Sequence, residues 1–390
     1  MKSVFLALGV FGAVLFGGQA RSAGLQVRFY PRETARPYEV NAPRGWNSVL
    51  LQNVSIVNDA EQELLLERVE LDLMAGGTAM QTQRVPADEL DRVAKRGAGL
   101  QKAGILENLK FQFRPDILLA GDVTLGESRR LPPKTAVLLS YRYFVFAPPA
   151  EAIRVRAYGR TPGGVAFEGE GSVAISSPKS AVTYSFPLRG NCFIGTGQAL
   201  HQGHRWVVPE EFALDIARIG EGGLTHRGDG SKRTNYFAYG AEVLAAADGT
   251  VVAVQDGIAE SDSTLRQESE SPEAYSQRVL SMQNELLSKG ALAAGGNYVV
   301  IQHAPREFSF YAHLLPGSIT VNKGRQVRRG DVIARLGHSG NSTEPHLHFH
   351  VVDGPDPVFS AGLPVHFENV ELPLADGPRE IQAGDIVQAR

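Results

Sequence analysis

Cysteine is almost absent from this chain of 390 residues, since Cys192 is the only one. No disulfide bond can therefore form within the chain. An excess of one sign of charge is missing as well, because the formal net charge is -3 at pH 7. Nucleic-acid binding proteins usually carry a strong basic footprint, so the composition argues against a nucleic-acid partner. A hydrophobic content of 43% is ordinary for a folded soluble protein, and the length suggests two or three domains.

Long hydrophobic runs are missing beyond Ala20. The opening stretch combines Lys2, an apolar run from Val4 to Phe16 and an exit of small residues. This order is typical of a secretory signal peptide, which we expect at residues 1–20, whereas a transmembrane anchor would need a longer run. No integral membrane span is expected after cleavage. Export without disulfides fits a bacterial periplasm better than a eukaryotic exterior, so we expect a secreted or periplasmic protein of the bacterial envelope.

Histidine is missing from the chain before His201, whereas all ten histidines lie between His201 and His366. The sequence is thus divided into a part without imidazoles and a part that is rich in them. Imidazole is a common metal ligand and general base, so we expect any chemistry in the second part.

Residues 24–185 are rich in β-forming runs that are separated by glycine, proline or polar turns. In the run AIRVRAYGR, the apolar Ile153, Val155 and Ala157 alternate with polar side chains, as in a half-buried antiparallel strand. About seven such strands predict a mostly β fold that begins with an immunoglobulin-like β-sandwich.

One segment interrupts these strands, ADELDRVAKRGAGLQKAGILENLKFQF, and it is predicted to be helical with breaks at Gly97 and Gly99. Nothing in this half of the chain suggests chemistry. We therefore interpret residues 24–185 as an accessory domain, either a spacer or a module for a protein partner.

A stretch with proline, serine and glycine at residues 176–191 is interpreted as a linker. After it, residues 190–370 contain short strand-like runs punctuated by glycines, as expected for an antiparallel β fold with tight turns. We predict a second β domain at 190–370 and a C-terminal tail at 371–390.

Residues 256–290 look like an insertion in a loop of this second domain. A polar, acidic stretch leads into a predicted helix at 271–290, where Ser271 suits the N-cap, Pro272 the first turn and Gly290 the stop. The favoured interpretation is a surface excursion whose apolar stripe packs on the core. The alternative is a lid or a wall of a substrate groove.

Three histidines stand at alternate positions in EPHLHFHV. In a strand, alternate side chains share a face, so His346, His348 and His350 point one way and the apolar residues between them the other. Neighbouring imidazoles of this kind can converge on one zinc ion, although a solvated face is the alternative.

Other segments strengthen the zinc interpretation. His204 precedes Asp215, a carboxylate between apolar neighbours in FALDIA, and His313 ends another β-forming run, FYAHLL. A carboxylate in an apolar strand needs a partner, and a metal ion would provide one.

The segments YGAEVLAAADGTVVAV, GNYVVIQH, YAHL and VNKGRQVRRGDVIARLGHSGNSTEPHLHFHV together resemble the lysostaphin/LytM-type zinc metallopeptidases, over roughly residues 200 to 353. The resemblance implies a small antiparallel β fold with a long substrate groove and one zinc ion per chain. It assigns His204, Asp215 and His348 as zinc ligands, and His313 and His346 as the catalytic pair.

The chain departs from the family pattern at the first two ligands. The family's common form places its histidine much closer to the aspartate, so the residues between His204 and Asp215 must loop out. His201 is therefore a rival to His204 as ligand. By the resemblance His350 is not a ligand, and it lies along the groove or is solvated.

The remaining candidates receive structural interpretations. His226, His303, His338 and His366 are expected to be structural, although the loop position of His338 would allow contact with substrate. Cys192 is expected to be a small buried hydrophobic residue rather than a fourth ligand in a latent zinc site.

The resemblance implies an exported zinc endopeptidase that hydrolyses peptide bonds of peptidoglycan stem peptides or cross-links by means of zinc-activated water. Two other classes remain open. One is a non-enzymatic or latent family member that regulates other cell-wall hydrolases, and the other is a structural zinc module with a closed site. All five site positions are filled in this sequence, which favours the enzyme.

Overall fold

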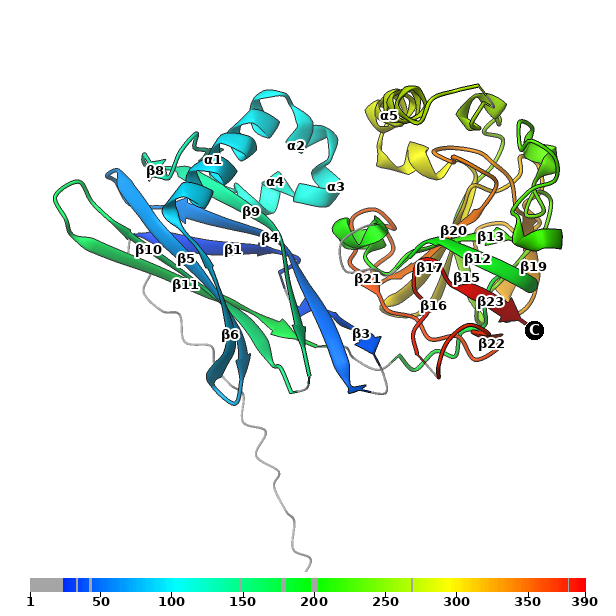
Figure 1. Cartoon of the computed structure of the whole chain (residues 1–390), viewed down its shortest axis with the longest axis horizontal. Coiled ribbons are helices and arrows are strands. Elements are labelled where there is room, and N and C mark those ends of the chain that lie inside the picture. Colours follow the sequence, from blue (N-terminus) through cyan, green and yellow to red (C-terminus); the bar gives the residue numbers. More distant parts are fainter. Residues whose placement is uncertain are drawn as a thin grey trace, which may run out of the picture.

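The computed structural model describes residues 24–32, 34–41, 44–147, 149–176, 180–197, 203–267, 269–377 and 379–390. The predicted signal peptide at 1–20 and the rival ligand His201 lie outside these described residues. Strands dominate the two halves, which lie side by side, so the predicted mostly β class is confirmed (Figure 1). Among the described residues we found no helix with the length and apolar character that a membrane crossing needs.

The first half consists of two sheets that face each other across one apolar core (Figure 1). One sheet contains β1 (Leu25–Tyr30), β3 (Pro37–Asn41), β4 (Trp46–Asn58), β7 (Thr124–Leu125) and β9 (Thr135–Phe146). The other contains β2 (Thr34–Ala35), β5 (Leu64–Ala75), β6 (Thr78–Val85), β8 (Arg130–Leu131), β10 (Ala152–Arg160) and β11 (Ala166–Ile175). The sandwich is present, and its immunoglobulin-like assignment stays a prediction.

Strand β10 shows the predicted alternation. Ile153, Val155 and Ala157 are buried in the core, and the side chains between them point outward. Both arginines on the outer face, Arg154 and Arg156, donate to Asp72 on the neighbouring strand β5, at 2.9 Å from Nη2 to Oδ2 in each case.

Four helices cover one end of the sandwich: α1 (Ala87–Lys102), α2 (Ile105–Asn108), α3 (Lys110–Phe113) and α4 (Pro115–Leu118) (Figure 1). The predicted breaks at Gly97 and Gly99 are wrong, because α1 runs through both and ends before Gly104. Gly104 has φ +71° and takes the left-handed turn. Gly97 is instead a packing position, since a Cβ there would lie 3.2 Å from Leu125 Cδ1.

The second half is built on a ten-stranded sheet. Its strands are β12 (Gly190–Thr196), β13 (Leu214–Arg218), β15 (Gly249–Gln255), β16 (Tyr298–Ala304), β17 (Glu307–Ala312), β18 (Gln326–Val327), β20 (Leu347–Val352), β21 (Gly362–Leu363), β22 (Val370–Glu371) and β23 (Ile386–Ala389). A separate pair is formed by β14 (Glu242–Leu244) and β19 (Val332–Arg335). In the large sheet β20 lies between β17 and β13, and this order positions the site described below.

Two boundaries differ from the prediction. The segment 371–390 is not a separate tail, because β23 pairs with β12 and its residues Val387 and Ala389 belong to the second core. Tyr184 also lies in that core, so the second domain begins before residue 190. Both ends of this domain therefore meet on adjacent strands.

Helix α5 (Pro272–Ser288) lies in the connection between the antiparallel neighbours β15 and β16, as expected for an insertion (Figure 1). Ser271 caps it, since its hydroxyl accepts a hydrogen bond from the Ala274 N–H at 3.2 Å, and Pro272 occupies the first turn. The helix has no fully buried residue, so it lies on the surface of the domain.

Candidate metal centre

Strand β20 carries the three alternating histidines at the centre of the second sheet. Leu347, Phe349 and Val351 are buried in the core on one face. On the opposite face His348 pairs in register with Asp215 of β13 on one side and with Ala312 of β17 on the other. The period of a strand therefore delivers the imidazoles to one surface, and the strand order brings Asp215 beside them.

The three predicted zinc ligands converge. His204 Nε2 lies 2.9 Å from Asp215 Oδ2, and His348 Nδ1 lies 3.0 Å from Asp215 Oδ1. The ligand atoms of the three residues all lie within 4.8 Å of one another. Two imidazole nitrogens and a carboxylate form a donor set of the kind found in catalytic zinc sites.

Glu210 orients the His204 ring. Its Oε2 lies 2.9 Å from His204 Nδ1, and a carboxylate only accepts, so Nδ1 carries a proton. Nε2, which faces Asp215, is then the nitrogen that would offer its lone pair to a metal ion in exchange for a proton. Metal-ligating histidines commonly donate their other N–H to such a partner. The sequence reasoning missed Glu210. A carboxylate six residues after a candidate ligand was the available signal, but only the turn of the chain places it on the ring.

His350 orients His348 in the same way. His350 Nε2 donates to the Pro357 carbonyl at 3.2 Å, so its Nδ1 accepts from His348 Nε2 at 2.9 Å. His348 Nδ1 is then left with a lone pair that faces Asp215. His350 is buried, which contradicts the solvated alternative, and it supports a ligand instead of serving as one.

This hydrogen bonding tests whether a metal ion fits. Asp215 is approached within 3.0 Å by two ring nitrogens, of His204 and His348, whose protons are committed elsewhere. Lone pairs that face a carboxylate at this distance repel, so a cation must lie among them, either as extra protons or as a metal ion. The residues present therefore fit a metal.

The two predicted catalytic histidines flank this group. His346 Nδ1 lies 2.7 Å from the Glu344 carbonyl and His313 Nδ1 lies 2.8 Å from the Ser339 carbonyl. Both carbonyls accept, so in the neutral rings both Nε2 atoms carry lone pairs, although burial is outweighed by Asp215, which raises the pKa of His346 and favours a proton there. His346 Nε2 lies 3.4 Å from Asp215 Oδ1, and the His313 and His346 ring centres are 4.7 Å apart.

His313 has an unusual backbone conformation at the end of β17. Its φ of +62° is in the left-handed region, which costs free energy for a residue other than glycine. The conformation is held by the hydrogen bond from the His313 N–H to the Gly295 carbonyl at 3.0 Å. The strain turns the chain out of the strand where the His313 ring meets the His346 ring.

Electrostatics in the absence of a bound ion follow from burial and close contact. Burial opposes charge on Asp215, but the imidazoles of His204 and His346 outweigh it and hold the Asp215 pKa well below its usual range. Burial likewise disfavours charge on His204, yet Asp215 and Glu210 raise the pKa of His204 well above normal. Burial and the neighbouring His346 and His348 lower the pKa of His313, which is therefore neutral at pH 7. Protons on His204 compete with a metal ion, so metal binding releases them.

The histidines line a cavity of about 390 Å³ that is walled by three parts of the chain. The helical end of the sandwich contributes Leu109, Phe111 and Gln112, and α5 contributes Gln283 and Leu287. In Figure 1 these helical segments lie on the same, upper side of the two halves. The insertion thus forms part of the wall of the site, in agreement with the less favoured of its two interpretations.

The other histidines and the cysteine take structural positions. His338 is buried between Thr264 and Ser342, and His303 bonds the Asp248 carbonyl and Ser309, whereas His366 pairs with Glu380 at the surface. His226 packs on Tyr236.

Cys192 is buried in the second core, where burial raises the pKa of its thiol to about 12, so it acts as a hydrophobic residue.

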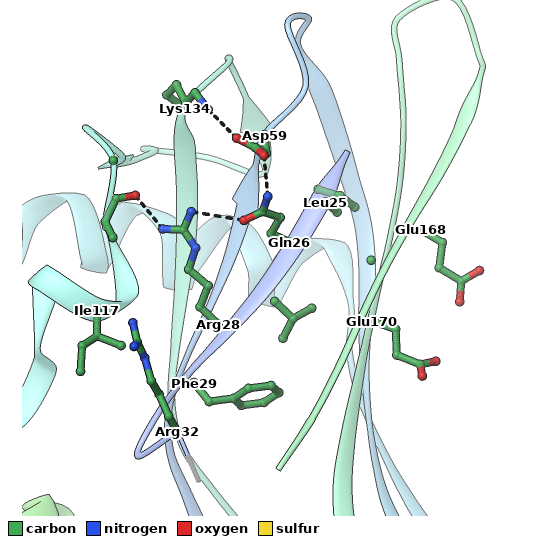
Figure 2. Close-up of a pocket in the computed structure, with 14 residues that line it drawn as sticks. Leu25, Gln26, Arg28, Phe29, Arg32, Asp59, Ile117, Lys134, Glu168 and Glu170 are labelled. Atoms are coloured by element: carbon green, nitrogen blue, oxygen red, sulfur yellow. Dashed lines mark hydrogen bonds and ion pairs between the residues drawn. The ribbon is translucent and has the colours of Figure 1, made fainter. Parts of the chain in front are cut away.

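A larger hollow of about 890 Å³ lies on the sandwich and contains no histidine. Figure 2 shows its basic side chains, Arg28, Arg32 and Lys134, and the acidic Glu168 and Glu170 on a neighbouring strand. Asp59 bonds both Gln26 and Lys134 there. Lys134 and Asp59 form an ion pair in this hollow, and among the described residues the one group that could hold a metal ion is that of His204, Asp215 and His348.

Comparisons with known proteins agree with the site. Residues 271–359 match the family model described as Peptidase family M23, which confirms the predicted resemblance for this part of the chain. The matched segment contains His313, His346 and His348. His204 and Asp215 precede it, so their assignment depends on the geometry above.

Two curated proteins from Vibrio cholerae serotype O1 are similar over short segments. Peptidoglycan DD-endopeptidase ShyA is 34% identical over 95 residues, which cover 24% of this chain and 20% of ShyA. Peptidoglycan DD-endopeptidase ShyB is 44% identical over 72 residues, which cover 18% of this chain and 16% of ShyB. The matches thus span a fifth or less of the length of these relatives.

Solved structures with M23 domains are also similar. The catalytic domain of the M23 protein EnpA from Enterococcus faecalis is 15% identical with a TM-score of 0.25, over 48% of this chain and 93% of that chain. The catalytic domain of lysostaphin from Staphylococcus simulans is 15% identical with a TM-score of 0.23, over 46% of this chain and 88% of that chain.

Proposed function

We propose that this chain, which carries a segment of peptidase family M23, is an exported zinc metalloendopeptidase that hydrolyses peptide bonds of peptidoglycan. The observation that carries the proposal is the convergence of the ligand atoms of His204, Asp215 and His348 within 4.8 Å. Two further histidines, His313 and His346, lie beside this group with lone pairs on Nε2.

The proposed ligands are His204 through Nε2, Asp215 through its carboxylate and His348 through Nδ1. A zinc ion held by these residues would supply Lewis-acid activation of water or of the scissile carbonyl. Glu210 and His350 hold the two ligand rings in the required tautomers.

His313 and His346 share the proton transfers. Their Nε2 lone pairs allow one ring to accept the proton of the attacking water. The other ring, protonated on Nε2, stabilises the negative charge that develops on the carbonyl oxygen or gives that proton to the leaving amine. Because their Nδ1 protons are bound to the Ser339 and Glu344 carbonyls, both rings keep a fixed orientation during the transfer.

The substrate assignment is supported by the names of the similar proteins. ShyA and ShyB are peptidoglycan DD-endopeptidases, so we assign this chain to cross-link or stem peptides of peptidoglycan. Such a substrate requires export, as expected from the signal-like segment at 1–20.

A digest tests the proposal. Mature protein from Arg21 onward would be incubated with diaminopimelate-type peptidoglycan, with and without a chelator, and the products read by mass spectrometry. We expect chelator-sensitive loss of cross-linked dimers, and the products name the bond. A zinc-loaded protein that leaves the polymer intact but stimulates another wall hydrolase would overturn the enzyme in favour of the regulator.

A further inference from the structure

The chain between His204 and Asp215 is anchored in the sandwich. This interval spans 11 positions and contains two short turns of 3-10 helix, η2 (Gly203–Trp206) and η3 (Val208–Glu210). Turns this short have little stability of their own. Packing against other parts of the chain must therefore order these turns. Many of the residues that pack on them belong to the accessory domain.

Arg205, the residue after the first ligand, is fully buried against the sandwich. Its Nη2 donates to the Ser48 hydroxyl of β4 at 3.1 Å, and its guanidinium lies 4.1 Å from the centre of the Tyr38 ring of β3. A buried cation is costly unless it is compensated, and the aromatic face supplies part of that compensation. Arg205 thus stays in this position only while the sandwich is docked.

Gln52 of β4 holds the interval at two points. Its amide Nε2 lies 3.2 Å from the Arg205 carbonyl and 3.2 Å from Glu211 Oε2. Glu211 directly follows Glu210, which orients the His204 ring. One side chain of the sandwich therefore contacts the residue after the ligand and the residue after its orienting carboxylate.

Two further contacts close the interface. The Trp206 ring meets the Tyr141 ring of β9 edge-on, with centres 4.9 Å apart. Val208 is buried in an apolar cluster that includes Val57 and Leu138 of the sandwich. The docking of the two domains therefore explains the length of the interval between His204 and Asp215, since the residues of the interval contact the accessory domain.

We propose that the sandwich helps to form the metal centre. Arg205 is the positioning residue: it is anchored in the accessory domain and thereby holds the neighbouring His204 in place. The inference rests on the proposed zinc function. A loop that is ordered before the ion arrives binds it more tightly than one that must be ordered on binding. The accessory domain thus sets the zinc affinity of the peptidase domain without supplying a ligand.

The test is a zinc titration of the full mature chain against a chromophoric chelator, which reports affinity independently of activity. We expect Arg205→Ala to weaken zinc binding by about tenfold or more, as for other residues that support a ligand. Gln52→Met, which keeps the size of the side chain and removes its donor, should weaken binding in the same direction from the other domain. Unfolding curves of the metal-free proteins identify variants that fail to fold.

A matched control weakens a different contact between the same two domains. Gln382 of the second domain donates to the Val40 carbonyl of β3 at 3.5 Å, and neither residue belongs to the ligand interval. Gln382→Met should leave zinc affinity unchanged. Equal affinity in wild type, Arg205→Ala and Gln52→Met would overturn the inference, as would an equal loss in Gln382→Met. A wild-type chain that binds no zinc would instead overturn the proposed function.

Discussion

Each half of the molecule has an aspartate on a strand, Asp72 fully buried and Asp215 with an 18% exposed side chain, but the partners differ. In the sandwich Asp72 accepts from Arg154, Arg156 and the Thr82 hydroxyl, so its charge is matched by permanent cations. In the second domain Asp215 faces His204 and His348, whose near nitrogens hold either a proton or a metal ion beside it. Thus a carboxylate with arginine partners has its counter-charge within the chain, whereas one with imidazole partners takes up protons or a metal ion.

Removal of a proposed ligand should have the largest effect. His348→Ala deletes one of the three converging atoms, so we expect it to lose zinc and peptidoglycan cleavage together. Metal analysis of the purified protein and the digest measure the two losses. His366→Ala is the control, since that histidine is 81% exposed and should be silent. Full zinc content in His348→Ala would refute its assignment as a ligand.

Removal of a flanking histidine should lower the rate of cleavage without removing zinc. His313→Ala should keep zinc and lower the rate by about 10²–10⁴-fold, the usual contribution of a general acid or base. Because His313 has φ +62°, His313→Asn is a second variant that tolerates this backbone conformation. Wild-type kcat in either variant would show that the ring takes no part in proton transfer.

Neutralising the aspartate of the sandwich should lower stability but leave zinc binding unchanged. In Asp72→Asn Arg154 loses its counter-charge and Arg156 keeps only Glu70. We expect the free energy of unfolding to fall by about 2–3 kcal/mol, less than for a fully buried pair because both arginines are partly exposed. Zinc content should stay at the wild-type level. Denaturant unfolding and metal analysis check both parts, and a loss of zinc would break the distinction between the two aspartates.

Glu211 is intermediate between these two aspartates. It is buried, and its hydrogen-bond partner is the amide of Gln52 rather than a permanent cation. Burial raises its pKa to about 7, against the lowering by Arg205 and Arg36. The folded state then holds the proton more tightly than the unfolded state, so stability from this group is present below the unfolded pKa. It is lost as the pH rises through about 7, by up to about 3 kcal/mol.

Glu211→Gln should remove this part of the pH dependence. We expect wild type to lose stability relative to the variant between about pH 4.5 and pH 7, the interval between the two pKa values. Denaturant unfolding of the metal-free proteins at several pH values gives the difference directly. A constant difference across this interval would show that Glu211 is already charged in the folded state.

The sequence by itself determined what depends on short-range periodicity. The alternation in β10 and the shared face of His346, His348 and His350 follow from the two-residue period of a strand, and both are found. The start of α5 at Ser271 and Pro272 follows from local capping chemistry. These features depend on neighbours in the chain, so the order of residues contains the information.

Tertiary structure alone decided the long-range arrangement. Glu210 reaches the His204 ring because the interval turns back on itself, and within that turn Arg205 is buried and donates to Ser48 of the sandwich. Gly97 does not break α1, since its lack of a side chain is used for packing against Leu125. Strand β23 joins β12 across nearly the whole second domain. In each case burial and pairing between segments far apart in the sequence outweigh local preference, and local patterns do not contain that information.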